Sequence, residues 1–337
     1  MRYRRFGQSD LVVSEVGFGA WTIAMNWWGE VDDPAGLVHA ALDTGITFFD
    51  TAPVYGENGA GEEMLAKILG RTRSEIVLTT KCGYDISAPR IAPGHSERPH
   101  DWNPASVRRQ LEESLRRLGT DYIDLYQLHN ATIDPIRADD LWVELEKMRA
   151  DGLVRELGVA LGPAIGWVDE GVEAIRERPI VSLQTVMNVL EQEPGRTFLA
   201  EPNVASQRVG IIARVPHASD VLSGLVTRDT VFEADDHRSH RNRDAILDLL
   251  DMKDHVEFLA DPDSGRTLGQ AAIAGLLASE GVTTVLPTCT TEEQVREYAQ
   301  ASDLPLSPEE RARLDDVWTS GFGGMERRAE PVFKSSV

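Results

Sequence analysis

The sequence predicts a (β/α)8 barrel, a fold in which eight parallel strands alternate with helices and the strands close into a central barrel. Short apolar segments alternate with longer amphipathic segments along the chain, as expected for successive strand–helix–strand units. The apolar segments are largely continuous, which is typical of parallel strands that are covered on both faces. Eight segments are candidate strands: Val16–Gly19, Ile46–Phe49, Ile76–Thr79, Tyr122–Leu128, Val154–Val159, Val181–Val186, Val209–Ala213 and Thr283–Leu286.

A short polar hairpin is predicted ahead of the barrel, with strands at Met1–Phe6 and Leu11–Val13. The clearest helix is Pro104–Leu118, because its apolar residues recur at spacings of three and four. The last helix is expected to begin at Ser307-Pro308-Glu309-Glu310, which combines an N-cap, a first-turn proline and a capping box. Further helices are expected around Leu37–Leu42, Gly61–Leu69, Leu141–Met148, Ile246–Leu259 and Leu268–Leu277.

The main alternative fold is an open, doubly wound sheet. That fold would need a glycine-rich phosphate turn directly after the first strand, and Gly17-Phe18-Gly19-Ala20-Trp21 lacks the third glycine at the required spacing. No repeat, low-complexity tract or linker interrupts the chain, so residues 1–337 are expected to form a single domain. Two long loops, Ser87–Asn103 and Val226–Arg241, are expected to be functional, as loops of this length in compact domains usually are.

Composition narrows the class of partner. The chain has 55 acidic and 34 basic residues and a formal net charge of −21, which argues against nucleic acid because phosphate binding needs a basic surface. The acidic, lysine-poor surface fits either a high-salt habitat or a GC-rich genome.

No apolar run reaches the about 18 residues of a membrane span, and no signal peptide is evident. Cys82 and Cys289 suggest neither a disulfide framework nor a metal site, so we expect a cytoplasmic protein with a small-molecule partner. Its oligomeric state is left open.

Polar side chains follow three predicted strands at the end where a barrel of this kind carries its active site. Asp50 follows the second strand, Lys81 the third and His129 the fourth, and Tyr55 comes five residues after Asp50. Each has an ordinary structural explanation, such as a turn, a strand-end lysine or a buried histidine. Four groups of complementary chemistry at one end of a barrel are less easily explained in that way, and they predict a shared site.

These residue types suit proton donation to a carbonyl oxygen. A phenol with a pKa near ~10 is a weak acid at neutral pH, and the ammonium of Lys81 is expected to lower the pKa of Tyr55. Asp50 would keep Lys81 charged and oriented, while His129 could hydrogen-bond the carbonyl oxygen of a substrate. The set holds no nucleophile–base pair for hydrolysis and no clustered carboxylates, so no metal is expected.

Four segments carry a family resemblance: FDTAPVYG at Phe49–Gly56, TKCG at Thr80–Gly83, SLRRLGTDYIDLYQLH at Ser114–His129, and GLVRELGV at Gly152–Val159. Together they resemble the aldo-keto reductase superfamily over nearly the whole chain, and the first and third segments are highly specific. The resemblance implies a (β/α)8 barrel and a nicotinamide cofactor. It also implies a catalytic tetrad in which Tyr55 is the acid, formed by Asp50, Tyr55, Lys81 and His129.

The resemblance further implies NADP(H) as the favoured cofactor, with NAD(H) as the alternative. Aromatic side chains beyond the first and third strands are expected to wall the substrate pocket. The implied cofactor contacts are Gly19, Trp21, Asp50, Gln184, Arg214, Pro216, Ser223, Gly224, Thr288, Thr290, Gln294 and Glu297. The expected substrate-pocket residues are Trp21, Trp27, Trp28, Tyr55, Tyr84 and His129.

The cofactor region departs from the family pattern. Ala160-Leu161 replace a serine and an asparagine that usually hold the nicotinamide carboxamide, and Asp220 replaces a glycine. Arg214 replaces an aromatic residue that usually stacks on the nicotinamide, although a planar guanidinium can also stack. Thr288–Thr291 bring no lysine or arginine for the 2′-phosphate of NADP, and Tyr298 replaces the asparagine of a Glu-Asn pair for adenine.

Three functions are compatible with these residues. The first is reduction of an aldehyde or ketone, sugar-type substrates included, to the alcohol, or the reverse reaction. The second is redox-neutral elimination or epimerisation of a carbonyl or sugar substrate by the same tetrad. The third is a non-catalytic, nicotinamide-binding regulatory subunit, as the potassium-channel β-subunits partly are. The complete tetrad favours an enzyme, and the first function in particular.

Overall fold

A computed structural model describes residues 1–25, 28–90, 98–162, 166–233 and 236–329. Its central element is an eight-stranded parallel sheet in which each strand pairs with the next one along the chain, in the order β3 to β10. The strands are β3 (Phe18–Gly19), β4 (Phe48–Asp50), β5 (Val77–Cys82), β6 (Ile123–His129), β7 (Val154–Ala160), β8 (Ser182–Val186), β9 (Gly210–Arg214) and β10 (Val282–Leu286).

The sheet closes between its first and last strands. Val16 forms a parallel bridge with Val285. The Val285 amide donates to the Glu15 carbonyl at 2.9 Å, and the Gly17 amide donates to the Val285 carbonyl at 2.9 Å. The predicted (β/α)8 barrel is therefore confirmed, and every predicted strand is present to within a few residues. The first strand is shorter than expected because Val16 takes part only as an isolated bridge.

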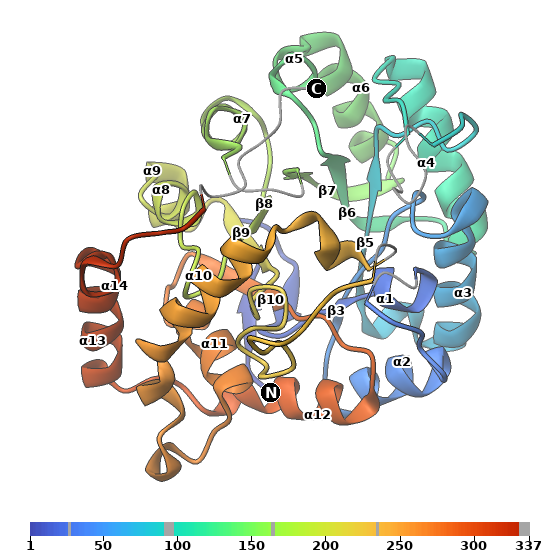
Figure 1. Ribbon diagram of the computed structural model, residues 1–337. Helices are drawn as coiled ribbons and strands as arrows, with labels where there is room; N and C mark the ends of the chain where they lie inside the picture. Colours follow the sequence, from blue (N-terminus) through green and yellow to red (C-terminus); the bar gives the residue numbers. More distant parts are fainter. Residues whose placement is uncertain (26–27, 91–97, 163–165, 234–235, 330–337) are drawn as a thin grey trace.

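Helices surround the strands (Figure 1). The expected helices are all found, and the capping box between Ser307 and Glu310 forms as predicted. Of the longer helices, α7 (Val168–Glu177) and α12 (Glu292–Gln300) were not predicted, because both segments hold few large apolar residues. The helices are α1 (Trp21–Ala24), α2 (Pro34–Asp43), α3 (Ala60–Leu69), α4 (Pro104–Leu118), α5 (Ile133–Arg137), α6 (Asp139–Ala150), α7 (Val168–Glu177), α8 (Gly195–Leu199), α9 (Pro202–Ala205), α10 (Arg243–Asp254), α11 (Leu268–Leu277), α12 (Glu292–Gln300), α13 (Pro308–Thr319) and α14 (Gly321–Gly324).

The predicted hairpin, β1 (Tyr3–Arg5) and β2 (Val12–Ser14), covers the amino-terminal end of the barrel. Phe6, Leu11 and Val13 are buried and pack with inward-facing strand residues such as Phe48. These apolar residues close the amino-terminal end of the barrel. Polar side chains can therefore gather at the opposite end, where the carboxyl ends of the strands lie.

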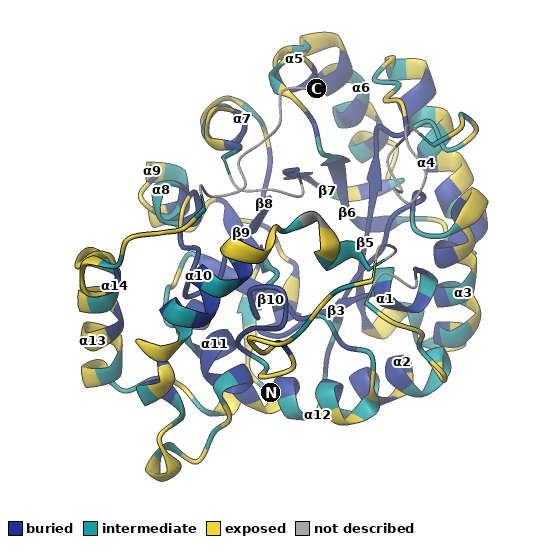
Figure 2. Cartoon of the chain, in the orientation of Figure 1, coloured by how far each residue is buried: buried dark blue, intermediate teal, exposed yellow. Residues whose placement is uncertain are grey.

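The strands are buried, whereas the helices turn exposed residues outward (Figure 2). In β4, Phe48 packs inside the barrel, Phe49 packs outward against the helices, and Asp50 again faces inward. This alternation follows from the two-residue period of a strand, and it places Asp50 at the inner rim. The pairs Gly19 with Asp50, His129 with Ala160, and Val186 with Arg214 bring the carboxyl ends of neighbouring strands to a similar level. None of the helices within the described ranges is long and apolar enough to cross a membrane.

Candidate active site

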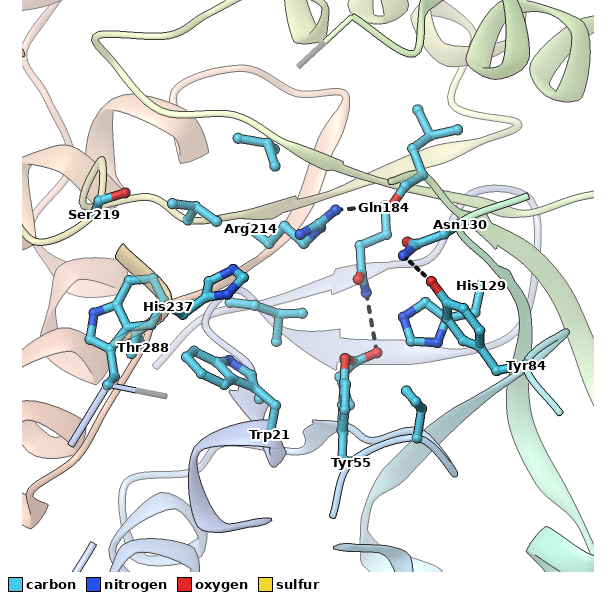
Figure 3. Close-up of a pocket in the computed structure, with 18 of the residues that line it drawn as sticks. Trp21, Tyr55, Tyr84, His129, Asn130, Gln184, Arg214, Ser219, His237 and Thr288 are labelled. Atoms are coloured by element: carbon cyan, nitrogen blue, oxygen red, sulfur yellow. Dashed lines mark hydrogen bonds between the residues drawn. The ribbon is translucent and has the colours of Figure 1, made fainter. Parts of the chain in front are cut away.

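A pocket opens at the carboxyl ends of the strands. It is elongated: Tyr84, His129 and Asn130 lie at one end, Ser219, His237 and Thr288 at the other, and Arg214 and Gln184 in between (Figure 3). The residues that line it come from most of the strands or from the loops that follow them. They are Gly19, Trp21, Trp28, Asp50, Val54, Tyr55, Tyr84, His129, Asn130, Leu161, Gln184, Val186, Arg214, Val215, Ser219, His237, Arg241, Leu286 and Thr288.

Lys81 connects the groups at the base of this pocket. Its Nζ donates to Asp50 Oδ2 at 2.7 Å, to the Thr51 carbonyl at 2.9 Å and to the Tyr55 hydroxyl at 3.2 Å. The Lys81 side chain is 0% exposed and that of Asp50 is 4% exposed. All three donor hydrogens of the ammonium thus have acceptors, which fixes the position of the Tyr55 hydroxyl relative to a buried ion pair.

Two carboxamides hold the second oxygen of Asp50. Gln127 Nε2 donates to Asp50 Oδ1 at 3.3 Å, and Gln184 Nε2 donates to the same atom at 3.1 Å. Gln184, an expected cofactor contact, lines the pocket, but its amide nitrogen is directed at Asp50. Its carbonyl oxygen and its second N–H are therefore left for a ligand.

Burial controls the proton affinities of these groups. Burial raises the pKa of Tyr55 above its ordinary value, and the nearby Lys81 ammonium opposes that rise without cancelling it. Lys81 therefore acts in the expected direction, but loss of solvent around the phenol outweighs the neighbouring cation, and the pKa of Tyr55 is raised overall. For Lys81, burial opposes the charge, but Asp50 and Tyr55 outweigh it, and its pKa is raised. At neutral pH Tyr55 is protonated and Lys81 is charged.

His129 faces Tyr55 edge to face, with ring centroids 6.0 Å apart and an interplanar angle of 90°. Burial, followed by repulsion from Lys81 and Arg214, holds the pKa of His129 well below its ordinary value. A neutral imidazole therefore faces the phenol. Such a ring can donate one hydrogen bond without adding charge to the pocket.

Tyr84 and Asn130 wall the pocket beside His129. Asn130 adopts a left-handed conformation with φ of 54°, and its Nδ2 donates to the Tyr84 hydroxyl at 2.8 Å. His100 stacks on Tyr84 with centroids 4.1 Å apart, and Trp102 stacks on His100 at 5.0 Å. Trp102 is a supporting residue outside the pocket lining. Asn130 was not predicted from the sequence, although it directly follows His129 and asparagine tolerates this conformation better than most residues.

The other expected aromatic wall lies beyond the first strand. Trp21 and Trp28 line the pocket, and their rings meet edge to face at 5.1 Å. Trp27 lies outside the described residues. Cys82 is buried and not part of the pocket lining, and burial raises the pKa of its thiol to about 12, which agrees with a packing role.

The loop after β9 crosses the pocket near Trp28. Arg238 Nη1 contacts Asp220 Oδ2 at 2.6 Å, and the Trp28 indole donates to the same carboxylate. The Arg238 guanidinium also lies 5.1 Å from the Trp28 ring centroid. Arg241, from the same loop, pairs with Glu191 at 2.9 Å. We call Trp28, Asp220 and Arg238 the clasp. The sequence predicted a functional loop here but gave no sign of these partners.

Most of the remaining expected cofactor residues lie outside the pocket lining. Gly19 and Thr288 line the pocket. Gln294 Oε1 accepts from the Thr290 amide at 2.8 Å and, in the α12 capping box, from the Thr291 amide at 3.3 Å. Glu297 Oε1 accepts from the Thr267 hydroxyl at 2.5 Å. The others are set back from the lining: Pro216 is buried, Ser223 is partly buried and donates to the Asp220 carbonyl, and Gly224 is exposed.

The segment after β9 has an unusual backbone conformation. Val215, Ala218, Ser219 and Asp220 all have positive φ, of 59°, 49°, 58° and 68°. Val215 and Ser219 of this segment line the pocket. Within the described ranges no three His, Cys, Asp or Glu side chains gather in a way that could hold a metal ion.

Comparison with known proteins agrees with this geometry. A profile of the Aldo/keto reductase family matches residues 15–319. The chain is 27% identical over 326 residues to aldo-keto reductase YhdN of Bacillus subtilis (strain 168), covering 94% of this chain and 93% of that protein.

Solved structures show the same architecture. Aldo-keto reductase AKR11C1 from Bacillus halodurans, solved in a holo form, matches with a TM-score of 0.73 and 29% identity, covering 94% of this chain and 96% of the other. Glycerol dehydrogenase AKR11B4 from Gluconobacter oxydans matches with a TM-score of 0.78 and 27% identity, covering 99% of both chains. The chain therefore belongs to the aldo/keto reductase family of oxidoreductases, which bind nicotinamide cofactors.

Proposed function

We propose that this protein reduces an aldehyde or ketone to the alcohol, or catalyses the reverse reaction, with Tyr55 as the proton donor or acceptor. The observation that carries the proposal is the contact of Lys81 Nζ with both Asp50 Oδ2, at 2.7 Å, and the Tyr55 hydroxyl, at 3.2 Å, at the base of a pocket. A protonated phenol that is held by a buried cation can donate its proton to an oxygen atom that gains negative charge during the reaction.

Each residue has a distinct task in this proposal. A bound nicotinamide supplies or accepts the hydride. His129, neutral because its pKa is well below the ordinary value, donates to the substrate carbonyl oxygen and directs it towards Tyr55. The Tyr55 proton passes to that oxygen as it gains negative charge. Lys81 then stabilises the phenolate that remains, and Asp50 keeps Lys81 in place.

The choice between NADP(H) and NAD(H) depends on the far end of the pocket. The family resemblance favours NADP(H). Among the described residues from Leu286 to Gln300 the one basic side chain is Arg296, which lies near Asp43 and Glu292 at 3.6 and 3.5 Å. Gln294 is engaged in the α12 cap. These contacts leave NAD(H) as a serious alternative, because a 2′-phosphate would gain no charged partner here.

The pocket wall suits a small, polar carbonyl compound. Trp21 and Trp28 offer aromatic faces, and Tyr84 and Asn130 offer hydroxyl and amide groups beside His129. Aromatic faces combined with hydrogen-bonding groups are typical of sites that bind sugars and other hydroxylated molecules. We therefore place hydroxy-aldehydes and hydroxy-ketones, with their alcohols, among the proposed substrates.

Binding and turnover together test the proposal. Purified protein is titrated with NADPH and with NADH, and tryptophan fluorescence reports binding. We expect one of them to bind, and Tyr55→Phe to keep that affinity while turnover falls by about 10²–10⁴-fold. Tyr122→Phe is the matched control, since Tyr122 lies just before β6 at the opposite end of the barrel and stacks with Arg73.

Three outcomes would contradict the proposal. Lack of binding of both nucleotides at high micromolar concentration would exclude a nicotinamide-dependent reaction. Nucleotide binding without turnover of any carbonyl compound would favour a regulatory role, and turnover without net oxidation of the nucleotide would favour elimination or epimerisation. Full turnover by Tyr55→Phe would remove Tyr55 from the reaction.

A further inference from the structure

Arg214 places a cation in the middle of the pocket. It ends β9, and its side chain lies between the Tyr84 and His129 end and the Ser219 and Thr288 end (Figure 3). The guanidinium is close enough to Tyr55, Asp50 and Tyr84 to interact with them electrostatically. Arg214 and Tyr55 therefore line the same part of the pocket.

Backbone groups hold the guanidinium in place. Arg214 Nη2 donates to the Leu161 carbonyl at 2.9 Å and also to the Gly162 carbonyl. Its Nε is buried and has no hydrogen-bond partner among the residues that the structure describes. Arg214 is therefore fixed by neutral acceptors at the end of β7, where Ala160-Leu161 replace the usual polar pair, and its charge is not used in packing.

The charge of Arg214 lacks a carboxylate partner in the described part of the chain. Lys81 is paired with Asp50 at 2.7 Å. Arg241, the other arginine of the lining, is paired with Glu191 at 2.9 Å. Arg214 alone contributes a positive charge that no described acidic group balances within salt-bridge distance. Inside a partly closed pocket such a charge acts strongly on a nearby ligand, because little water screens it.

The two redox states of a nicotinamide differ in charge at the ring. The oxidised ring is a cation, whereas the dihydronicotinamide ring is neutral, and the rest of the dinucleotide is the same. For hydride transfer to a carbonyl held by Tyr55 and His129, the ring must lie beside these residues, in the part of the pocket that Arg214 borders. This step rests on the proposed function.

We propose that Arg214 makes the pocket discriminate between the redox states of its cofactor, so that the reduced form binds more tightly than the oxidised form. Repulsion between the guanidinium and the oxidised ring weakens binding of that form, and the reduced ring meets no such repulsion. An aromatic face in this position would attract a cation instead. After a carbonyl has been reduced, the oxidised cofactor leaves this pocket readily.

Equilibrium binding tests the inference without reference to turnover. The reduced nucleotide is titrated by energy transfer from Trp21 and Trp28, which line the pocket, and the oxidised nucleotide is measured by competition. The measured quantity is the dissociation constant of the oxidised nucleotide divided by that of the reduced nucleotide. It is determined for whichever cofactor, NADP(H) or NAD(H), binds more tightly. A common loss of affinity caused by altered packing cancels in this ratio.

Three variants separate charge from shape. We expect Arg214→Gln to lower the ratio by on the order of tenfold, Arg214→Trp to lower it further, and Arg214→Lys to keep most of the wild-type value. Thermal unfolding confirms that each variant is folded. A ratio that Arg214→Gln leaves unchanged would overturn the inference while the proposed function stands. Absence of binding of both redox states to the wild-type protein would overturn the inference and the proposed function together.

Discussion

Removal of Arg238 should loosen the clasp and destabilise the protein in a pH-dependent way. The side chains of Asp220 and Arg238 are 6% and 15% exposed, and their closest atoms are 2.6 Å apart. Truncating one partner of a buried ion pair typically destabilises a protein by about 3–5 kcal/mol, because the other charge is left in a poorly solvated place. Trp28 still donates to Asp220, and the loop can open to admit water. We therefore expect Arg238→Ala to lower the free energy of unfolding by about 2 kcal/mol at pH 7.

Urea unfolding of Arg238→Ala and Arg228→Ala, at pH 7 and at pH 5, measures the effect. Arg228 is a matched control, because it lies in the same region but is 54% exposed where it meets Asp251. Its loss should change stability by roughly 0–1 kcal/mol.

The sign of the pH effect follows from Asp220. Burial raises the pKa of this carboxyl, and Arg238 opposes the rise. Without Arg238 the pKa of Asp220 rises further, so the folded variant holds a proton on Asp220 at a pH where the folded wild-type protein has lost it. Stability of the variant, relative to wild type, then increases as the pH falls through that window. Equal losses for the two variants, or a loss that is the same at both pH values, would refute this account of the clasp.

Three further predictions concern cofactor choice, pH and the support of the barrel. Thr288→Lys should raise the affinity for NADPH relative to NADH by about tenfold in fluorescence titrations, because a lysine can pair with the 2′-phosphate. If the ratio of the two affinities does not change, the 2′-phosphate does not lie near residue 288. Carbonyl reduction should not vary with pH between the ordinary pKa values of histidine and tyrosine, because the pKa of Tyr55 is raised and that of His129 is well below its ordinary value. A fall in rate with a midpoint inside that range would contradict this. Glu62→Leu should lower the free energy of unfolding by about 3–5 kcal/mol, because Glu62 is 0% exposed and pairs with buried Arg117 at 2.6 Å. The double variant Glu62→Leu with Arg117→Met should recover part of the lost free energy of unfolding.

Local patterns were enough to predict most of the fold. Continuous apolar segments marked the strands because both faces of a parallel strand are covered, and spacings of three and four marked Pro104–Leu118 because one helical face is buried. Helices α7 and α12 escaped because their buried faces hold few large apolar residues. Asp50, Tyr55, Lys81 and His129 stood out since each follows or ends a strand, and the barrel brings such positions together at one end.

The sequence by itself thus determined the barrel, the end of it that carries polar groups, and the residue types available for proton transfer. Only the tertiary structure decided how these groups behave. The direction of the Tyr55 pKa depends on how completely side chains from other strands exclude water around it. Arg214 is held by carbonyls more than fifty residues away along the chain, and the clasp joins Trp28 to Asp220 across 192 positions. Desolvation and contacts at such separations depend on where distant segments pack, and no local pattern encodes that.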